Sequence, residues 1–135
     1  MKKINSIFII DDDPITVFGI RKMLGTNVEF KTISTYGNGQ LAIDGIKQVL
    51  TDNKSVPEVI FLDINMPIMD GWQFLEEFIE LSIEEKVRIN IVTSSIDPAD
   101  YQNFEYYNDK SHHQITFNTK PIKSSEIATI TKPAD

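Results

Sequence analysis

The chain has 135 residues, 41% of them hydrophobic and 24% charged, which is typical of a globular domain rather than of a disordered or fibrous chain. The formal net charge is -7 and Lys and Arg form no dense cluster, so direct nucleic-acid binding is disfavoured. The lack of cysteine excludes disulfides and thiolate chemistry, and no apolar run has the length of a signal peptide or a membrane span, so we expect a cytoplasmic protein without membrane insertion.

Strand-like and helix-like segments alternate along the sequence. Short apolar runs predict strands, and apolar residues three or four positions apart predict helices. The expected order is strand 6–10, helix 13–25, strand 30–35, helix 40–50, strand 59–62, a helix opening at 70, strand 88–95, helix 97–108, strand 114–121 and a short helix 124–130. We expect residues 1–135 to form a single domain, with 131–135 as a flexible tail.

Helix boundaries are marked by capping residues. Asp13 can cap the first helix, Pro14 suits its first turn, and Gly25 suits its end. Asp70 precedes Gln73 by three positions, which is the spacing of a capping box. These signals support the alternation of strands and helices.

The run "VIFL" at 59–62 is apolar at every position. Strands covered by helices on both faces have this pattern, whereas a sheet with one face in water alternates apolar and polar residues. We therefore expect an α/β fold, with a doubly wound parallel sheet that binds ligands beyond the carboxyl ends of its strands.

Polar and charged residues stand at those carboxyl ends. Asp11 and Asp12 follow the first strand, Asp63 follows the third, Thr93 the fourth, and Lys120 the fifth. Carboxylates gathered at one edge repel one another, and a hard cation such as Mg²⁺ between them relieves the repulsion. A carboxylate can also attack phosphorus while a metal ion and a lysine neutralise the transferring oxygens. The edge therefore predicts a site for magnesium and a phosphoryl group.

Four motifs give the chain a family resemblance. "FIIDDDP", "VIFLDINMPIMDG", "IVTSS" and "FNTKP" occur in this order, with separations similar to those of the response-regulator receiver domain of two-component signalling. The resemblance covers about residues 7–130. It implies a flavodoxin-like, five-stranded parallel sheet in the order 2-1-3-4-5 with helices on both faces, here as a stand-alone, single-domain receiver.

The resemblance also implies roles around the metal. Asp11 and Asp12 match the acidic pair that binds Mg²⁺. Asp63 matches the phosphoacceptor, which is a metal ligand as well, and Asn65 matches the position whose backbone carbonyl binds the metal. Magnesium is thus the expected cofactor.

Further matching positions concern the conformational change that follows phosphorylation in this family. Thr93 matches the hydroxyl that turns toward the phosphoryl group, Lys120 the lysine that pairs with it, and Phe117 the aromatic switch position. Asn65 and Ser95 flank the expected path of the attacking water and are predicted to tune the phosphoryl lifetime. A cis peptide is implied between Lys120 and the proline that follows it.

The function implied is a phosphorylation switch. A sensor histidine kinase or histidine phosphotransfer protein would phosphorylate Asp63, and the change would alter binding to a downstream protein target or pass phosphate onward. The chain would be a signalling protein, not an enzyme, acting only on its own phosphoryl group.

Two alternatives remain open. A small magnesium-dependent phosphohydrolase of the haloacid-dehalogenase kind would use the Asp-x-Asp pair formed by Asp11 and Asp13, although this leaves Asp63 without a role. A pseudo-receiver would bind partners without phosphorylation, although the complete set of acidic, hydroxyl and lysine positions argues against it.

The segment between the fourth and fifth strands departs from compact receivers. Thr93 and Lys120 are 27 residues apart, and we expect the extra length in a loop around 105–114. His112 and His113 fall in this polar stretch and are interpreted as solvated. The aromatic residues of the preceding helix are expected to pack into the core, with a partner surface as the alternative; they are Tyr101, Phe104, Tyr106 and Tyr107.

Overall fold

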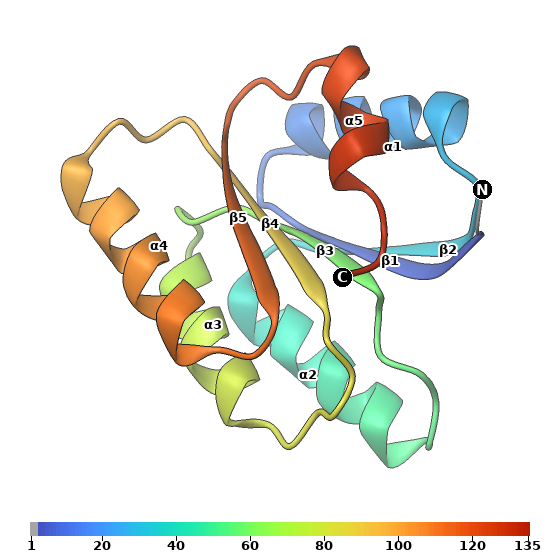
Figure 1. The fold of residues 1–135 in the computed structure, drawn as a ribbon, viewed down its shortest axis with the longest axis vertical. Coiled ribbons are helices and arrows are strands. Elements are labelled where there is room, and N and C mark those ends of the chain that lie inside the picture. The colour runs from blue at the N-terminus through green and yellow to red at the C-terminus, as the bar shows by residue number, and fades with distance from the viewer. Residues whose placement is uncertain (1–2) are drawn as a thin grey trace.

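A computed structural model describes residues 3–135; residues 1 and 2 of the expected domain lie outside the described part. Strands and helices alternate throughout, as predicted (Figure 1). The elements are β1 (Ile4–Ile10), α1 (Pro14–Asn27), β2 (Phe30–Tyr36), α2 (Gly39–Thr51), β3 (Val59–Leu62), α3 (Gly71–Glu80), β4 (Arg88–Thr93), α4 (Pro98–Lys110), β5 (Gln114–Thr119) and α5 (Ser124–Ile130).

The five strands form one parallel sheet in the order β2-β1-β3-β4-β5, which confirms the predicted topology. Helices α1 and α5 cover one face, and α2, α3 and α4 cover the other (Figure 1). Every residue of β3 and β4 is buried, as expected for strands between two helical layers. The carboxyl ends of all five strands consequently lie at one edge of the sheet.

Two of the predicted caps are present. The Asp13 side chain accepts a hydrogen bond from the Ile15 N–H, and Asp70 forms a complete capping box with Gln73. The predicted end of the first helix at Gly25 was wrong, because α1 continues to Asn27. Gly25 is exposed, and a glycine inside an exposed helix costs only about 1 kcal/mol, which the packing of neighbouring residues offsets.

The expected loop around 105–114 is largely helical. Helix α4 extends to Lys110, two residues beyond the prediction, and only residues 111–113 connect it to β5. The fourth and fifth strands also end two residues earlier than predicted, at Thr93 and Thr119. The extra length therefore extends the helix rather than the loop.

His113 corrects the prediction of a solvated histidine pair. Its side chain is buried and its ring centroid lies 5.0 Å from that of Phe78. Its Nδ1 atom accepts a hydrogen bond from the Val87 N–H at 3.0 Å. Burial is the main cause that lowers its pKa to about 4, with a further contribution from His112. The ring is buried because it fills space against Phe78 and satisfies a backbone donor; His112 is exposed, as predicted.

Helix α4 lies on the sheet without burying any of its residues. Phe104 and Tyr107 are half-buried against the core, whereas Tyr101 and Tyr106 are 50% and 56% exposed. The core-packing prediction is thus right for two of the four aromatic residues and wrong for the other two. A helix at the sheet margin has only a narrow covered stripe, so aromatic residues outside it remain in solvent.

The last five residues, expected as a flexible tail, lie beside the start of β4 and β5. Thr131 is buried, and the Asp135 N–H donates to the Gln114 side-chain oxygen at 3.2 Å. Lys86 donates to the Asp135 carbonyl at 2.8 Å. Within residues 3–135, no helix has the length and apolar character needed to cross a membrane.

Candidate functional site

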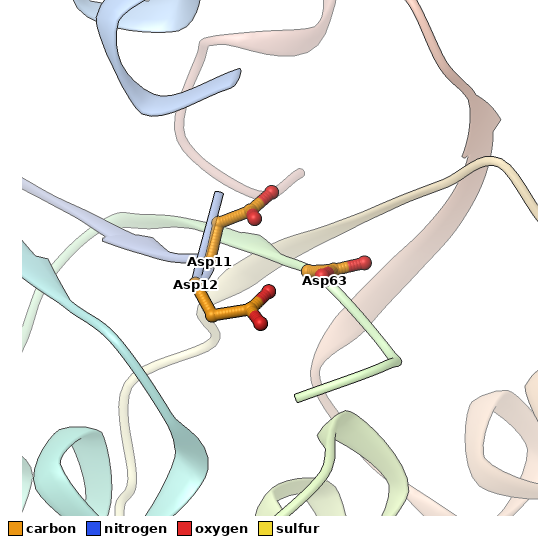
Figure 2. Close-up of side chains that lie close together, drawn as sticks. All are labelled: Asp11, Asp12 and Asp63. Atoms are coloured by element: carbon orange, nitrogen blue, oxygen red, sulfur yellow. The ribbon is translucent and has the colours of Figure 1, made fainter. Parts of the chain in front are cut away.

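Three carboxylates meet at the carboxyl edge of the sheet. Asp11 and Asp12 follow β1 and Asp63 follows β3, and these strands are hydrogen-bonded neighbours whose last residues, Ile10 and Leu62, are in register. One carboxylate oxygen of each aspartate lies within 4.8 Å of the others. Figure 2 shows the three side chains projecting beside one another from the two strand ends. The sheet topology thus produces the predicted acidic cluster.

A lysine from the other half of the sheet joins the cluster. The Lys120 Nζ atom lies 3.2 Å from Asp11 Oδ2 and 3.7 Å from Asp63 Oδ1. The Lys120 backbone N–H donates to the Thr93 carbonyl at 2.8 Å, which fixes the end of β5 beside that of β4. The peptide bond between Lys120 and Pro121 is cis, as predicted.

The electrostatics of the cluster indicate a shortage of positive charge. Burial and, next, the negative charge of Asp11 raise the pKa of Asp63 to about 6, although Lys120 acts in the opposite direction. Burial also raises the pKa of Asp11, although the Asp13 N–H and Lys120 act in the opposite direction. Asp12 is exposed. An added cation would favour the ionised form of both buried carboxylates.

The carboxylate oxygens also have the chemistry of a magnesium site. Mg²⁺ prefers oxygen ligands and is commonly held by one or two carboxylates together with water and phosphate oxygens. Asp11, Asp12 and Asp63 offer such oxygens at mutual separations that one ion can bridge. Asn65 is exposed in the loop just beyond Asp63. The residues present therefore fit the expected cofactor.

The loop after Asp63 is closely packed at Gly71. A Cβ atom at Gly71 would lie 2.5 Å from the Asp63 carbonyl oxygen and 2.9 Å from the Ile64 Cα atom. The Gly71 N–H donates to the Ile64 carbonyl at 2.9 Å, and the Ile64 N–H donates to Asp63 Oδ1 at 2.9 Å. The glycine allows the start of α3 to approach the strand end and so fixes the backbone of Asp63.

Thr93 and Ser95 connect the site to α4. Thr93 is fully buried at the end of β4, and its Oγ1 atom accepts a hydrogen bond from the Ser95 N–H at 3.0 Å. The Ser95 hydroxyl donates to the Asp100 carboxylate in the first turn of α4. Asp100 also accepts a hydrogen bond from the Trp72 indole N–H at 3.0 Å.

Asp100 and Trp72 were not among the predicted site residues. The two positions are 28 residues apart on different helices, and only the tertiary structure brings them together. In the sequence, Asp100 is one of several acidic residues in a polar helix, and Trp72 belongs to the apolar stripe of an amphipathic helix. Nothing in the neighbouring sequence of either residue predicts their contact.

Phe117 lies on β5 beneath α4. It is half-buried, with its ring centroid 5.5 Å from that of Tyr101 and 5.6 Å from that of Phe104. Asp13, by contrast, is not one of the three aspartates of the carboxylate cluster. It accepts hydrogen bonds from the Ile15 N–H and the Thr16 hydroxyl as a helix cap, as predicted.

Comparison with known proteins agrees with this arrangement. The family described as the response regulator receiver domain matches residues 7–132. The chain belongs to this family. The receiver domain is a module of two-component signalling, and the predicted resemblance is confirmed.

Individual relatives support the same family. An uncharacterized response regulatory protein of Vibrio cholerae is 27% identical over 129 residues, covering 95% of this chain and 44% of the relative. A two-component response regulator from Cytophaga hutchinsonii has a crystal structure with a TM-score of 0.78 and 25% identity, covering 96% of this chain and 95% of that one.

Some relatives are named as enzymes. A protein-glutamate methylesterase/protein-glutamine glutaminase of Methanococcoides burtonii is 40% identical over 63 residues, which is 47% of this chain and 16% of that protein. The chain spans less than half of the length of the curated relatives described here. The likeness therefore concerns the receiver domain alone.

Proposed function

We propose that this receiver domain accepts a phosphoryl group on Asp63 from the phosphohistidine of a sensor kinase or phosphotransfer protein. The observation that carries the proposal is a buried carboxylate at a strand end, with the Lys120 ammonium 3.7 Å away and two further carboxylates beside it. This arrangement offers a nucleophile, a cation for the transferred oxygens and oxygen ligands for a metal ion in one place.

The proposed cofactor is Mg²⁺, held by Asp11, Asp12, Asp63 and the Asn65 backbone carbonyl. When bound, it would neutralise negative charge on the phosphoryl oxygens. The raised pKa values of Asp11 and Asp63 support this assignment, because burial disfavours their ionised forms and a bound cation would favour them.

The chemical step uses the ionised Asp63. With a pKa of about 6, the carboxylate is largely deprotonated above neutral pH and able to act as nucleophile. An Asp63 oxygen attacks phosphorus in line, the phosphorus–nitrogen bond breaks, and its electron pair returns to the donor imidazole. Lys120 pairs with an oxygen of the transferred group. The product is an acyl phosphate on Asp63.

The proposed switch follows this transfer. Thr93 turns its hydroxyl toward the new phosphoryl group, and Phe117 changes its packing beneath α4. Tyr101 lies against Phe117 and is half-exposed, which supports a change in the surface offered to a downstream protein. Water then hydrolyses the acyl phosphate and restores Asp63. Asn65 and Ser95 are proposed to tune the lifetime of the phosphorylated form.

In this proposal the chain is a cytoplasmic signalling protein that acts only on its own phosphoryl group. It binds neither nucleic acid nor membrane directly. Its partners are the phosphohistidine protein and a downstream protein target, or a second phosphotransfer protein that receives the phosphate.

The test uses a small phosphodonor. The chain is incubated with acetyl phosphate and Mg²⁺, and the mass of one added phosphoryl group is located by peptide mapping. We expect a hydroxylamine-labile adduct on Asp63 that requires Mg²⁺ and is absent from Asp63→Asn. Asp44→Asn, which removes an exposed carboxylate on α2 away from the site, should retain the adduct.

Other outcomes would favour the alternatives. Steady turnover of a phosphate ester that is lost in Asp11→Asn but retained in Asp63→Asn would indicate a phosphohydrolase. Absence of both adduct and turnover, with Mg²⁺ present and the chain folded, would indicate a pseudo-receiver.

A further inference from the structure

Three hydrogen bonds join the predicted switch residue to the helical layer. The Ser95 N–H donates to Thr93 Oγ1, the Ser95 hydroxyl donates to one oxygen of Asp100, and the Trp72 indole N–H donates to the other. Asp100 thus links β4, the loop at 94–97, α3 and α4. All four side chains are at least partly buried.

This link adds to the contacts of α4, a helix that buries none of its residues. No residue of α4 is buried, so the helix is fixed chiefly by half-buried contacts at its margin. Trp72 is one such contact, with its ring stacked on Tyr107 at 5.7 Å and 10°. Asp100 lies in the first turn of α4, where a carboxylate is also favoured by the helix dipole. The first turn of α4 is therefore tied to α3 at one defined point.

The link constrains how Thr93 can move. Its hydroxyl oxygen accepts the Ser95 N–H, so a turn of Thr93 toward the phosphoryl group either breaks this bond or carries the loop with it. If the loop follows, the Ser95 hydroxyl is drawn away from Asp100, and the Asp100–Trp72 contact changes with it. Both routes lose a hydrogen bond, and bonds to charged groups are the stronger ones.

We propose that Asp100 is a positioning residue, which holds the 94–97 loop and Thr93 in their unphosphorylated arrangement by tying Ser95 to Trp72. This inference rests on the proposed phosphorylation of Asp63 and deepens it, because it names the restraint that the phosphoryl group has to overcome. Trp72 is the single tryptophan of the sequence, so its fluorescence reports directly on one end of the restraint.

The experiment measures binding of beryllium fluoride, a phosphoryl mimic, in the presence of Mg²⁺. In the unaltered chain, binding should change the Trp72 emission, and Asp63→Asn should abolish the change. Asp100→Ala should alter the emission before any ligand is added and should tighten beryllium fluoride binding by about tenfold or more, as expected for removing one charged hydrogen bond from the unbound state.

Two further variants distinguish this restraint from a general destabilisation of α4. Trp72→Phe keeps an aromatic ring for Tyr107 but removes the N–H donor, and calorimetry should show tighter binding in the same direction as Asp100→Ala. Asp97→Ala removes the N-cap of the same helix, whose side chain accepts the Ala99 N–H, but leaves the link between Ser95 and Trp72. Its affinity should stay within about twofold of the unaltered chain, because a cap acts on the stability of the helix.

A double substitution identifies the target of the restraint. In a Thr93→Ala background, Asp100→Ala should have no further effect on binding, because the restrained hydroxyl is gone. Equal affinity of Asp100→Ala and the unaltered chain, or an equal gain in Asp97→Ala, would overturn the inference while leaving phosphorylation of Asp63 intact. Absence of both beryllium fluoride binding and phosphorylation in the unaltered chain would overturn the proposed function and this inference together.

Discussion

The Lys120 ammonium lies closer to Asp11 than to Asp63, with Nζ 3.2 Å from an Asp11 oxygen and 3.7 Å from an Asp63 oxygen. Both carboxylates are buried, and burial raises the pKa of each. One positive charge is thus shared between two carboxylates that need it. The stability of the carboxylate cluster consequently depends on Lys120 and on any further cation that binds there.

Lys120→Gln should make the chain more dependent on magnesium. With a chelator present above neutral pH, we expect the free energy of unfolding to fall by about 1–3 kcal/mol, because two buried carboxylates lose their cation. Saturating Mg²⁺ should then restore more stability than it adds to the unaltered chain. Urea unfolding with and without Mg²⁺ measures both quantities. Lys47→Gln, on the exposed surface of α2, should show the unaltered magnesium gain; an equal gain in Lys120→Gln would contradict the prediction.

Asp63→Asn should raise the free energy of unfolding when a chelator is present, which is the opposite of the effect expected for Lys120→Gln. The substitution removes a charge that burial and Asp11 disfavour, and an amide oxygen can still accept the Ile64 N–H. We expect the free energy of unfolding to rise by about 1–2 kcal/mol above neutral pH and the stabilisation by Mg²⁺ to shrink. Asp12→Asn is the comparison, because Asp12 is exposed and its loss should change stability little without metal. A less stable Asp63→Asn chain in chelator would contradict the electrostatic account of the site.

Gly71→Ala should disturb the phosphoacceptor through its backbone. The new Cβ would lie 2.5 Å from the Asp63 carbonyl oxygen, so α3 or the strand end has to shift, at a cost of about 1–3 kcal/mol. Stabilisation by Mg²⁺ should weaken as the carboxylate moves. Gly25→Ala is the matched control, since nothing lies within 4 Å of its Cβ position and alanine favours the helix by about 1 kcal/mol. Thermal unfolding should therefore rank the chains Gly25→Ala, unaltered, Gly71→Ala; any other rank would refute the steric argument.

The meeting of the charged residues could be predicted because parallel strands place their carboxyl ends at one edge. Asp63 follows an apolar strand, and Lys120 precedes a proline that stops another, so each position is visible locally. The register between neighbouring strands then brings them together without further information. The fold and the acidic cluster were predictable for this reason.

The remaining features depend on packing between segments that are distant in sequence. His113 lies in a polar stretch of the sequence, which predicts exposure, but its side chain is buried beside Phe78. The hydrogen bond from Trp72 to Asp100 joins α3 to α4, and no spacing within either helix encodes it. Tyr101 and Tyr106 are the opposite case, since both are apolar in type but exposed. The sequence does not indicate whether the sheet extends far enough to cover an aromatic residue of α4.

The last prediction concerns His113 and the loss of folding stability at acidic pH. Its pKa falls from 6.5 to about 4 on folding because the ring is buried, and the Val87 N–H that donates to Nδ1 requires that nitrogen to be unprotonated. Above pH 6.5 both folded and unfolded chains hold the neutral ring, so its stabilising contribution is complete. As the pH falls from 6.5 toward 4, only the unfolded chain takes up the proton. The histidine should therefore remove up to about 3 kcal/mol of stability over this range.

The measurement compares urea unfolding of the unaltered chain, His113→Gln and His112→Gln above and below pH 6.5. Asp63 acts in the opposite direction as the pH falls through about 6, so the difference between chains is the informative quantity. His113→Gln should be less stable above pH 6.5, because it loses the contact with Phe78, and should lose less stability on acidification. The exposed His112→Gln should follow the unaltered chain. Parallel curves for all three chains would show that the buried ring does not govern the acid limit of the fold.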